Sequence, residues 1–133
     1  MVAPSLEQFV RYRAGNRCEY CRLPQAYHVR RFHVDHVIAK KHVDDEHSDN
    51  LALACYRCNG CKGTNIAGID PVSKVLTPLF NPRKNTWDEH FAWEGAALIG
   101  TTAIGRVTVK VLNINDWSAV RLRQALMRRG KFH

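Results

Sequence analysis

The pattern of apolar and polar positions divides the first half of the chain into short elements of mixed type. Apolar residues recur at helical spacing from about Leu6 to Ala14, behind a pair, Ser5 and Gln8, that resembles a capping box. From Tyr27 to Ile38 the chain is rich in β-branched and aromatic residues with partial alternation, and Leu51 to Ala54 is a short apolar run. The pattern therefore predicts a helix, then a strand or strand pair, then a segment that enters the core.

Polar segments flank that apolar run. The segment from Ala39 to Asn50 is rich in charge and poor in apolar residues, which predicts a surface loop whose acidic side chains are solvated. A short helix is predicted to begin near Asn59, although Gly60 and Gly63 each weaken it by about 1 kcal/mol relative to alanine. We expect the next stretch, Asn65 to Pro71, to be a turn-rich connection.

Alternation returns in the second half of the chain. From Trp87 to Trp93 a mostly aromatic set, Trp87, Glu89, Phe91 and Trp93, alternates with Asp88, His90 and Ala92, which predicts a strand with one mostly apolar face. Glu94 and Gly95 are suited to a turn, and the apolar residues from Ala97 to Ile99 then predict a second strand. This part of the sequence therefore predicts a β-hairpin.

The C-terminal part predicts helices. A helix capped by Thr102 is predicted through Val111, but the β-branched residues in that stretch leave a strand as a competing prediction. A clearer helix is predicted from Trp117 to Arg129, with Asn115 or Asp116 as its cap and Gly130 ending it.

Composition and charge limit the class of protein. A chain of 133 residues with 45% apolar residues fits a single domain, residues 1–133, with one modest core. Its 20 basic and 12 acidic residues give a net charge of +8, which favours a polyanionic partner such as DNA, with a merely soluble basic surface as the alternative. Basic residues concentrate from Arg83 onward, and we predict that Arg83 and Lys84 contact nucleic acid.

The sequence also predicts where the protein acts. It contains no apolar run near 18 residues and no charged-then-apolar leader, so we expect neither a membrane span nor a signal peptide, and we place the protein in the cytoplasm. The sequence gives no basis for an obligate protein partner.

The cysteines predict a metal site. Cys18 and Cys21 form one CxxC pair and Cys55 and Cys58 form another, and four thiolates satisfy tetrahedral zinc with no open position. Such a structural site contributes on the order of 10 kcal/mol to folding. Cys61 is left over: it either replaces Cys58 as a ligand or is a partly buried bystander. Buried thiols without a metal are the alternative to zinc.

A second constellation has the residue types for phosphodiester hydrolysis. The adjacent Asp35 and His36 are followed by Asn59, directly after the second CxxC pair. A neutral histidine, with an ordinary pKa of about 6.5, accepts a proton from water at pH 7. A carboxylate and an amide oxygen suit Mg²⁺ or Mn²⁺. Because neighbouring residues of a regular strand point to opposite faces, we expect the strand to end or distort at Asp35 and His36.

In its central motif the sequence resembles the HNH endonuclease family, in the variant whose ββα-metal core is braced by a four-cysteine zinc site. The resemblance implies an α+β fold: one small domain with an HNH core at about residues 16–68 and an extension at about residues 69–133 that carries a β-hairpin and helices. The later motifs resemble a compact group of bacterial HNH proteins along nearly the whole chain. The resemblance rests on Asp35-His36, Asn50, Cys55-x-x-Cys58-Asn59 and Lys62, and more weakly on Asn65-Ile66-Ala67-Gly68, Leu79-Phe80-Asn81-Pro82-Arg83, Trp87, His90-Phe91 and Gly105-Arg106.

The family resemblance also implies a role for each motif residue. His36 would be the general base, Asp35 and Asn59 would bind one divalent ion, and Asn50 would orient the loop that carries His36. Some family members have a further histidine ligand where this chain has Gly63. The resemblance therefore implies two protein ligands for the catalytic ion, and Lys62, next to Gly63, is predicted to contact nucleic acid.

Two functions follow from these residues. The first is a metal-dependent endonuclease that nicks or cuts DNA and leaves 5′-phosphate and 3′-hydroxyl ends, as the family does. The second is a non-enzymatic, zinc-stabilised module that binds nucleic acid, which explains the cysteines and the charge but not the combination of Asp35, His36 and Asn59. A thiol redox protein is disfavoured because two CxxC pairs occur and no thioredoxin-like βαβ pattern accompanies them.

Overall fold

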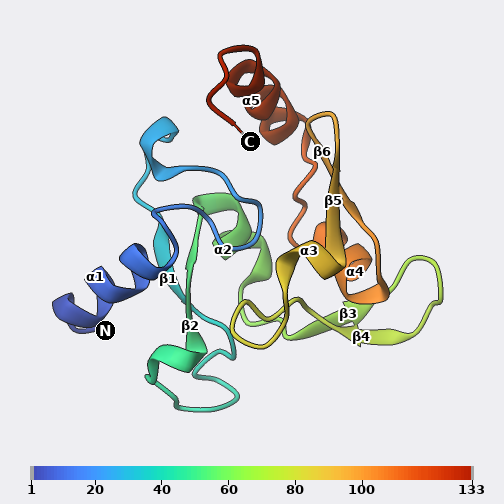
Figure 1. Ribbon diagram of the computed structural model, residues 1–133. Coiled ribbons are helices and arrows are strands. Elements are labelled where there is room, and N and C mark those ends of the chain that lie inside the picture. The colour runs from blue at the N-terminus through green and yellow to red at the C-terminus, as the bar shows by residue number, and fades with distance from the viewer. Residues whose placement is uncertain (1, 133) are drawn as a thin grey trace.

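The computed structural model describes residues 2–132 and places three antiparallel strand pairs among five α-helices (Figure 1). The fold is α+β, as predicted. None of the helices in residues 2–132 is long and apolar enough to cross a bilayer. In chain order the elements are α1 (Pro4–Arg13), β1 (His33–His36), β2 (Leu51–Ala54), α2 (Tyr56–Lys62), β3 (Ala67–Ile69), β4 (Leu76–Pro78), α3 (Trp87–His90), β5 (Phe91–Glu94), β6 (Ala97–Gly100), α4 (Ala103–Val111) and α5 (Trp117–Arg128), with short 3-10 turns at Gln25–Tyr27 and Ser48–Asn50.

The β1–β2 hairpin and α2 form the ββα unit that the family resemblance implied, but α2 begins at Tyr56, three residues before the predicted start near Asn59. All four residues of β2 are buried, which explains why this run lacks polar positions. Asp35 pairs with Ala52 and His36 pairs with Leu51, so the register is regular through the end of β1. The expected strand end at His36 is confirmed, but β1 contains no distortion before it.

The first helix forms as predicted, but not through the predicted cap. Ala3 is the N-cap of α1 and makes no side-chain hydrogen bond, and Pro4 occupies the first turn. The capping box of Ser5 and Gln8 is therefore wrong. Proline at this position has no N–H to leave unsatisfied and fixes a helical φ, so it starts the helix without a side-chain cap.

The strand predicted from Trp87 to Trp93 is wrong in its first half. Residues 87–90 form α3, and the strand begins only at Phe91. Trp87 and Phe91 are both buried, and their ring centroids are 5.1 Å apart. Residues four apart share one face of a helix, so this pair fits a helical turn, and the Trp87 indole N–H fixes the turn by donating to the Tyr20 carbonyl at 2.9 Å.

The structure of two further segments can be compared with the predictions made from the sequence. The stretch after Thr102 is a helix, because the Thr102 hydroxyl accepts a hydrogen bond from the Gly105 N–H and caps α4. The predicted turn-rich connection from Asn65 to Pro71 instead contains β3, which pairs with β4. The predicted strand at Ala97 and the final helix are confirmed, and Asp116 is the cap of α5.

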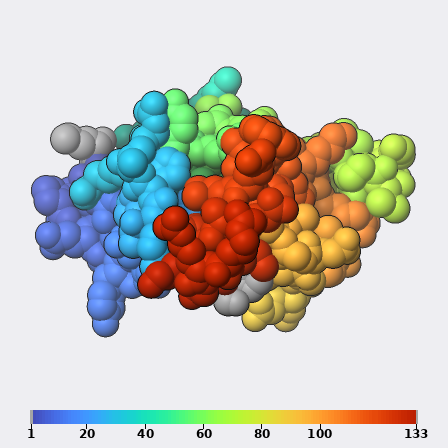
Figure 2. Space-filling view, turned by 90° about the horizontal axis from the view of Figure 1, so that it is seen from above, coloured from blue at the N-terminus to red at the C-terminus, as the bar shows by residue number. Residues whose placement is uncertain are grey.

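Helix α5 ties α2 to the C-terminal hairpin of β5 and β6. The buried Arg123 guanidinium donates to the Ala96 and Ile114 carbonyls and to the Asn115 side chain. At the start of α5, Asp116 forms an ion pair with Arg57 of α2 at 3.0 Å. Figure 2 shows the red surface of α5 between the blue surface of the N-terminal third and the orange surface of the later strands.

Helix α4 packs against β6 and α3 with no room for side chains at the contact, which gives a testable prediction. A Cβ atom added at Gly105 would lie 1.9 Å from the His90 carbonyl oxygen. We expect Gly105→Ala to lower the free energy of unfolding by at least about 2 kcal/mol, because backbone must move to admit the methyl group. Urea unfolding measures the change. Gly60→Ala is the matched control in α2, where nothing lies within 4 Å of the added Cβ, and it should leave stability equal or slightly higher.

Candidate functional site

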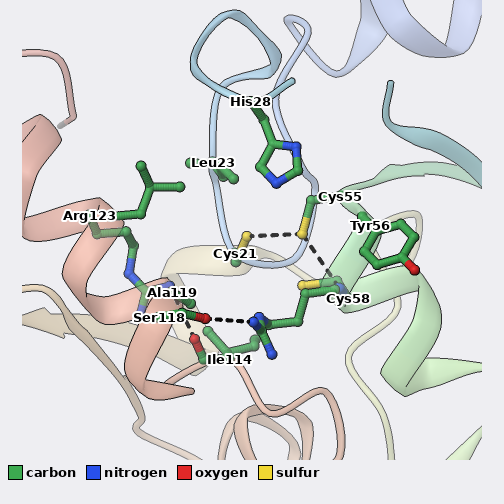
Figure 3. A pocket seen from close by; sticks show the side chains of 12 residues that line it. Cys21, Leu23, His28, Cys55, Tyr56, Cys58, Ile114, Ser118, Ala119 and Arg123 are labelled. Atoms are coloured by element: carbon green, nitrogen blue, oxygen red, sulfur yellow. Dashed lines mark hydrogen bonds between the residues drawn. The ribbon is translucent and has the colours of Figure 1, made fainter. Parts of the chain in front are cut away.

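Four buried cysteines meet between the N-terminal segment and α2. The side chains of Cys18, Cys21, Cys55 and Cys58 offer sulfur atoms that all lie within 4.8 Å of one another. The Cys21 and Cys55 sulfurs are 3.7 Å apart, too far for a disulfide bond, and Figure 3 shows them facing each other beside Cys58. Tetrahedral Zn–S bonds of about 2.3 Å place sulfurs about 3.8 Å apart. The geometry therefore fits a closed structural zinc site, and its fourth sulfur comes from Cys58, while Cys61 is a half-buried free thiol.

The chemistry of the cluster also calls for a cation. Contacts with the other three thiols, Cys18 first, and burial hold the pKa of Cys58 well above its ordinary value. Contacts of the same kind hold the pKa of Cys55 far below its ordinary value. Four crowded thiols therefore do not all ionise by themselves, and Zn²⁺ would supply the positive charge that lets them act as thiolates.

Asp35 lies in the interior, where α2 packs on β1. Its carboxylate accepts a hydrogen bond from the Tyr20 hydroxyl at 2.9 Å and forms an ion pair with the Lys62 ammonium at 3.2 Å. Burial raises the pKa of the Asp35 carboxyl, and the Lys62 charge and the Tyr20 hydroxyl oppose that rise. Lys62 is 1% exposed, so the prediction that it contacts nucleic acid from the surface does not fit its position. Its aliphatic stem packs in the core while its amine neutralises Asp35.

His36 lies at the end of β1 with its ring partly exposed. Its Nε2 atom is 3.0 Å from a carboxylate oxygen of Glu46, and the Lys40 ammonium lies 2.7 Å from the same oxygen. Lys40 first and His36 second hold the pKa of Glu46 below its ordinary value, so Glu46 acts as an acceptor. Nε2 therefore donates in this contact, which leaves Nδ1 as the acceptor of a neutral imidazole.

Asn50 closes the loop between the two strands. Its side-chain amide donates to the Ile38 and Asp45 carbonyls, and its side-chain oxygen accepts from the Ile38 N–H. The Val37 N–H adds a bond to the Asn50 carbonyl. Asn50 is buried, and these bonds hold the segment that follows His36 against the segment that carries Glu46. The residue thus fixes the loop around His36 without touching the imidazole.

Asn59 lies on α2, three residues before Lys62. Residues three apart share a helix face, so Asn59 faces the β1 side of the helix, where Lys62 meets Asp35. Within residues 2–132 the Asn59 side chain has no hydrogen-bond partner. Its amide oxygen and the weakly engaged Asp35 Oδ1, 3.4 Å from Lys62, are oxygen donors of the kind that a hard divalent cation takes.

The two basic residues predicted to contact nucleic acid differ in position. Arg83 is 13% exposed and forms an ion pair with Glu19, whose other carboxylate oxygen accepts from the Leu53 N–H. Arg83 therefore joins the second half of the chain to the zinc region, and a surface contact with nucleic acid does not fit this position. Lys84 is exposed and forms no ion pair with the described residues. Of the two, only Lys84 presents a free charge.

Sequence reasoning missed two residues that contact the site. Tyr20 lies inside the first CxxC motif, is fully buried, and donates its hydroxyl hydrogen to the Asp35 carboxylate. Glu46 belongs to a loop whose acids were predicted to be solvated, yet it binds His36 and Lys40. No sequence pattern links a histidine with an acidic residue ten positions later. The two side chains meet only because the loop between them folds back.

The ββα unit, the zinc-type cysteine cluster and the Asp35-His36 pair define a nuclease-type domain. Residues 18–65 match the family model described as HNH endonuclease. Over 105 residues, 77% of this chain, the sequence is 29% identical to the Septu protein PtuB of Bacillus thuringiensis. The match covers 38% of that protein, so the chain spans well under half the length of this relative. No solved structure matches the chain significantly.

Proposed function

We propose that this protein is a metal-dependent endonuclease that hydrolyses phosphodiester bonds of DNA. The observation that carries the proposal is the pairing of a partly exposed His36, held through Nε2 by Glu46, with the neighbouring carboxylate Asp35 at the end of β1. Within an HNH domain a histidine in this setting has the exposure and the fixed tautomer that a general base needs.

In this mechanism His36 takes the proton from the attacking water on Nδ1. The water oxygen forms a bond to phosphorus, the bond from phosphorus to the 3′ oxygen breaks, and the 3′ oxygen takes a proton from solvent water, so the products are a 5′-phosphate and a 3′-hydroxyl. Asp35 and Asn59 would hold one Mg²⁺ or Mn²⁺. When bound, that ion stabilises the charge on the leaving oxygen. Because Lys62 already neutralises Asp35, we expect the ion to bind weakly until DNA adds its phosphate oxygens.

Glu46 has a predicted role that the structure makes testable. We expect Glu46→Ala to lower kcat about 10-fold, less than loss of the base itself, because His36 remains but its ring is no longer held in one tautomer and orientation. KM should change little. Single-turnover cleavage measures the effect, and Glu46→Gln should recover part of the loss if the contact orients the ring through an oxygen acceptor.

The control for Glu46 is Asp44→Asn, which removes one negative charge from the same loop at an exposed residue without an ion pair among the described residues. It should cleave as wild type. Equal losses in the two variants would show that loop charge, and not orientation of His36, causes the effect.

The competing function is a zinc-braced module that binds nucleic acid without cutting it. The observation in its favour is the buried contact of Asp35 with Tyr20 and Lys62, which gives Asp35 a structural role that needs no ion. A supercoiled plasmid separates the two functions. We expect relaxed or linear DNA in reactions with Mg²⁺ or Mn²⁺ and none when no divalent ion is added, whereas the binding module shifts the plasmid on a gel and never cuts it.

Salt dependence tests the predicted contact with DNA. Each phosphate that the protein neutralises contributes about −0.9 to the slope of log affinity against log salt on duplex DNA. We expect a steep slope that becomes shallower by about that amount in Lys84→Ala, because Lys84 is exposed and unpaired among the described residues. Fluorescence anisotropy at several salt concentrations gives the slopes. An unchanged slope in Lys84→Ala would remove Lys84 from the contact, and a flat wild-type slope would mean that the charge serves only solubility.

A further inference from the structure

A hollow of about 360 Å³ adjoins the candidate active site. Val37 and Ile38, which directly follow His36, form part of its wall, and Leu79 and Ile104 contribute apolar surface from the second half of the chain. The volume falls in the range of sites that take small organic groups. The proposed catalytic and ion-binding residues Asp35, His36 and Asn59 are not among those that line this space.

One wall residue connects the hollow with the active-site residues. Lys62 lines it, and the Lys62 ammonium lies 3.2 Å from the Asp35 carboxylate and 3.1 Å from the His36 carbonyl oxygen. Lys62 therefore contacts both the hollow and the residues of the proposed hydrolytic site. A hollow that shares a wall residue with this site is placed to take a neighbouring part of the same substrate.

The polar side chains that line the hollow carry free hydrogen-bonding groups. Asn65 and Lys84 make no side-chain hydrogen bond within residues 2–132. Asn81 and Asn85 use their side-chain oxygens to accept backbone N–H groups, at 2.9 Å in each case, and their amide NH₂ groups donate to no partner among residues 2–132. The hollow thus combines apolar walls with several unused donors and one positive charge.

We propose that this hollow binds an unpaired nucleobase of the DNA substrate, next to the phosphate that is cut. A base has flat apolar faces that suit the walls and ring nitrogen and carbonyl acceptors that suit the amide donors, and the Lys84 charge suits the backbone that enters with it. A paired base must first leave the stack, so DNA with a bulged or mismatched nucleotide is the preferred substrate. This inference rests on the proposed function only in taking DNA as the ligand.

Binding of an extruded base is tested without cleavage. A duplex with a single bulged 2-aminopurine is titrated with the zinc-loaded protein in the absence of added Mg²⁺ or Mn²⁺, because 2-aminopurine changes its fluorescence when its stacking changes. The fluorescence should change by about 2-fold or more with wild type and with Lys110→Ala, an exposed lysine on α4 outside the hollow. Asn65→Trp, which places a large ring at an exposed lining position, should abolish the change while anisotropy still reports binding.

Cleavage provides a second arm on the same duplexes. Wild type should cut beside the bulge at least about 10-fold faster than it cuts the fully paired duplex, which corresponds to about 1.4 kcal/mol of unpairing that is no longer required. Asn65→Trp and Lys84→Ala should lose this preference. Thermal unfolding and zinc content confirm that each variant is folded.

The outcomes separate this inference from the proposed function. If no DNA is cut but the fluorescence change occurs and is lost in Asn65→Trp, the hollow binds a base and the nuclease proposal fails. If DNA is cut with equal rates on bulged and paired duplexes, or if Asn65→Trp responds as wild type does in both assays, the base-binding inference is overturned. Failure of the protein to bind either duplex overturns it as well.

Discussion

Replacing His36 by alanine should reduce DNA cleavage by about 10² to 10⁴-fold, because the variant lacks the side chain that takes the proton from water. The imidazole is only partly buried and contacts Glu46 at the surface, so its removal leaves the core, the cysteine cluster and Asp35 in place. Zinc content, thermal stability and DNA affinity should therefore equal those of wild type. A plasmid-relaxation time course at matched zinc content measures the loss.

His42→Ala is the matched control for His36. His42 lies in the loop that follows β1 and is exposed, and among residues 2–132 its ring makes one hydrogen-bond contact, with the Thr64 carbonyl. Its alanine variant should cut at the wild-type rate. If His36→Ala cuts within a few-fold of wild type, the base has been misassigned, and His33 or His42 is the next candidate.

The comparison with Asn59→Ala separates the base from the proposed ion. That variant should also lose cleavage, but raised Mn²⁺ should restore part of it, since the lost group is an oxygen donor to the ion. Raised Mn²⁺ should not restore His36→Ala. Equal restoration of both variants would contradict the division of roles between His36 and Asn59.

Replacing Cys18 by serine should impair folding and not merely activity. Cys18 is fully buried, and its sulfur lies with three others in the cluster that fits zinc. Zinc binding contributes on the order of 10 kcal/mol to folding in small metal-dependent domains, an amount comparable with their whole stability. Cys18→Ser and Cys55→Ser should therefore lose bound zinc and the cooperative unfolding transition, as measured by metal analysis and circular dichroism.

Cys61→Ser is the control for the zinc variants. Cys61 lies on α2 one turn after Cys58, is half-buried and is not part of the cluster. Its serine variant should retain zinc and stability. Unchanged zinc content in Cys18→Ser, or loss of zinc in Cys61→Ser, would show that the ligand set has been misassigned.

The sequence determined the parts of this protein whose chemistry is local. The CxxC spacing puts two sulfurs on one knuckle whatever surrounds them, and the structure brings the two knuckles together as predicted. The fully apolar run of β2 requires burial on both faces, and the cap and end of α5 follow from Asp116 and Gly130. These signals depend on residues close in sequence.

Tertiary structure decided what these local signals left open. The sequence predicted that Lys62, Arg83 and Lys84 contact nucleic acid, but Lys62 and Arg83 are internal because Asp35 and Glu19 lie where their side chains end. In the same way, Glu46 became a partner of His36 only because Asn50 pins the loop between them. Whether two groups far apart in the chain form a pair depends on how the loop between them closes. The spacing of residues in the sequence does not predict this closure.

After residue 62, the secondary structure also depends partly on local sequence pattern and partly on long-range packing. Period-two alternation predicted a strand from Trp87, but Trp87 and Phe91 satisfy both a strand and a helical turn, and the Tyr20 carbonyl selects the turn. The β-branched residues after Thr102 favour a strand by themselves, yet they form α4 because its buried face packs on β6. Local pattern therefore determined which residues carry the zinc and the proposed chemistry. Long-range packing decided which charged side chains remain free to meet a substrate, because burial and ion pairing are properties of the folded chain.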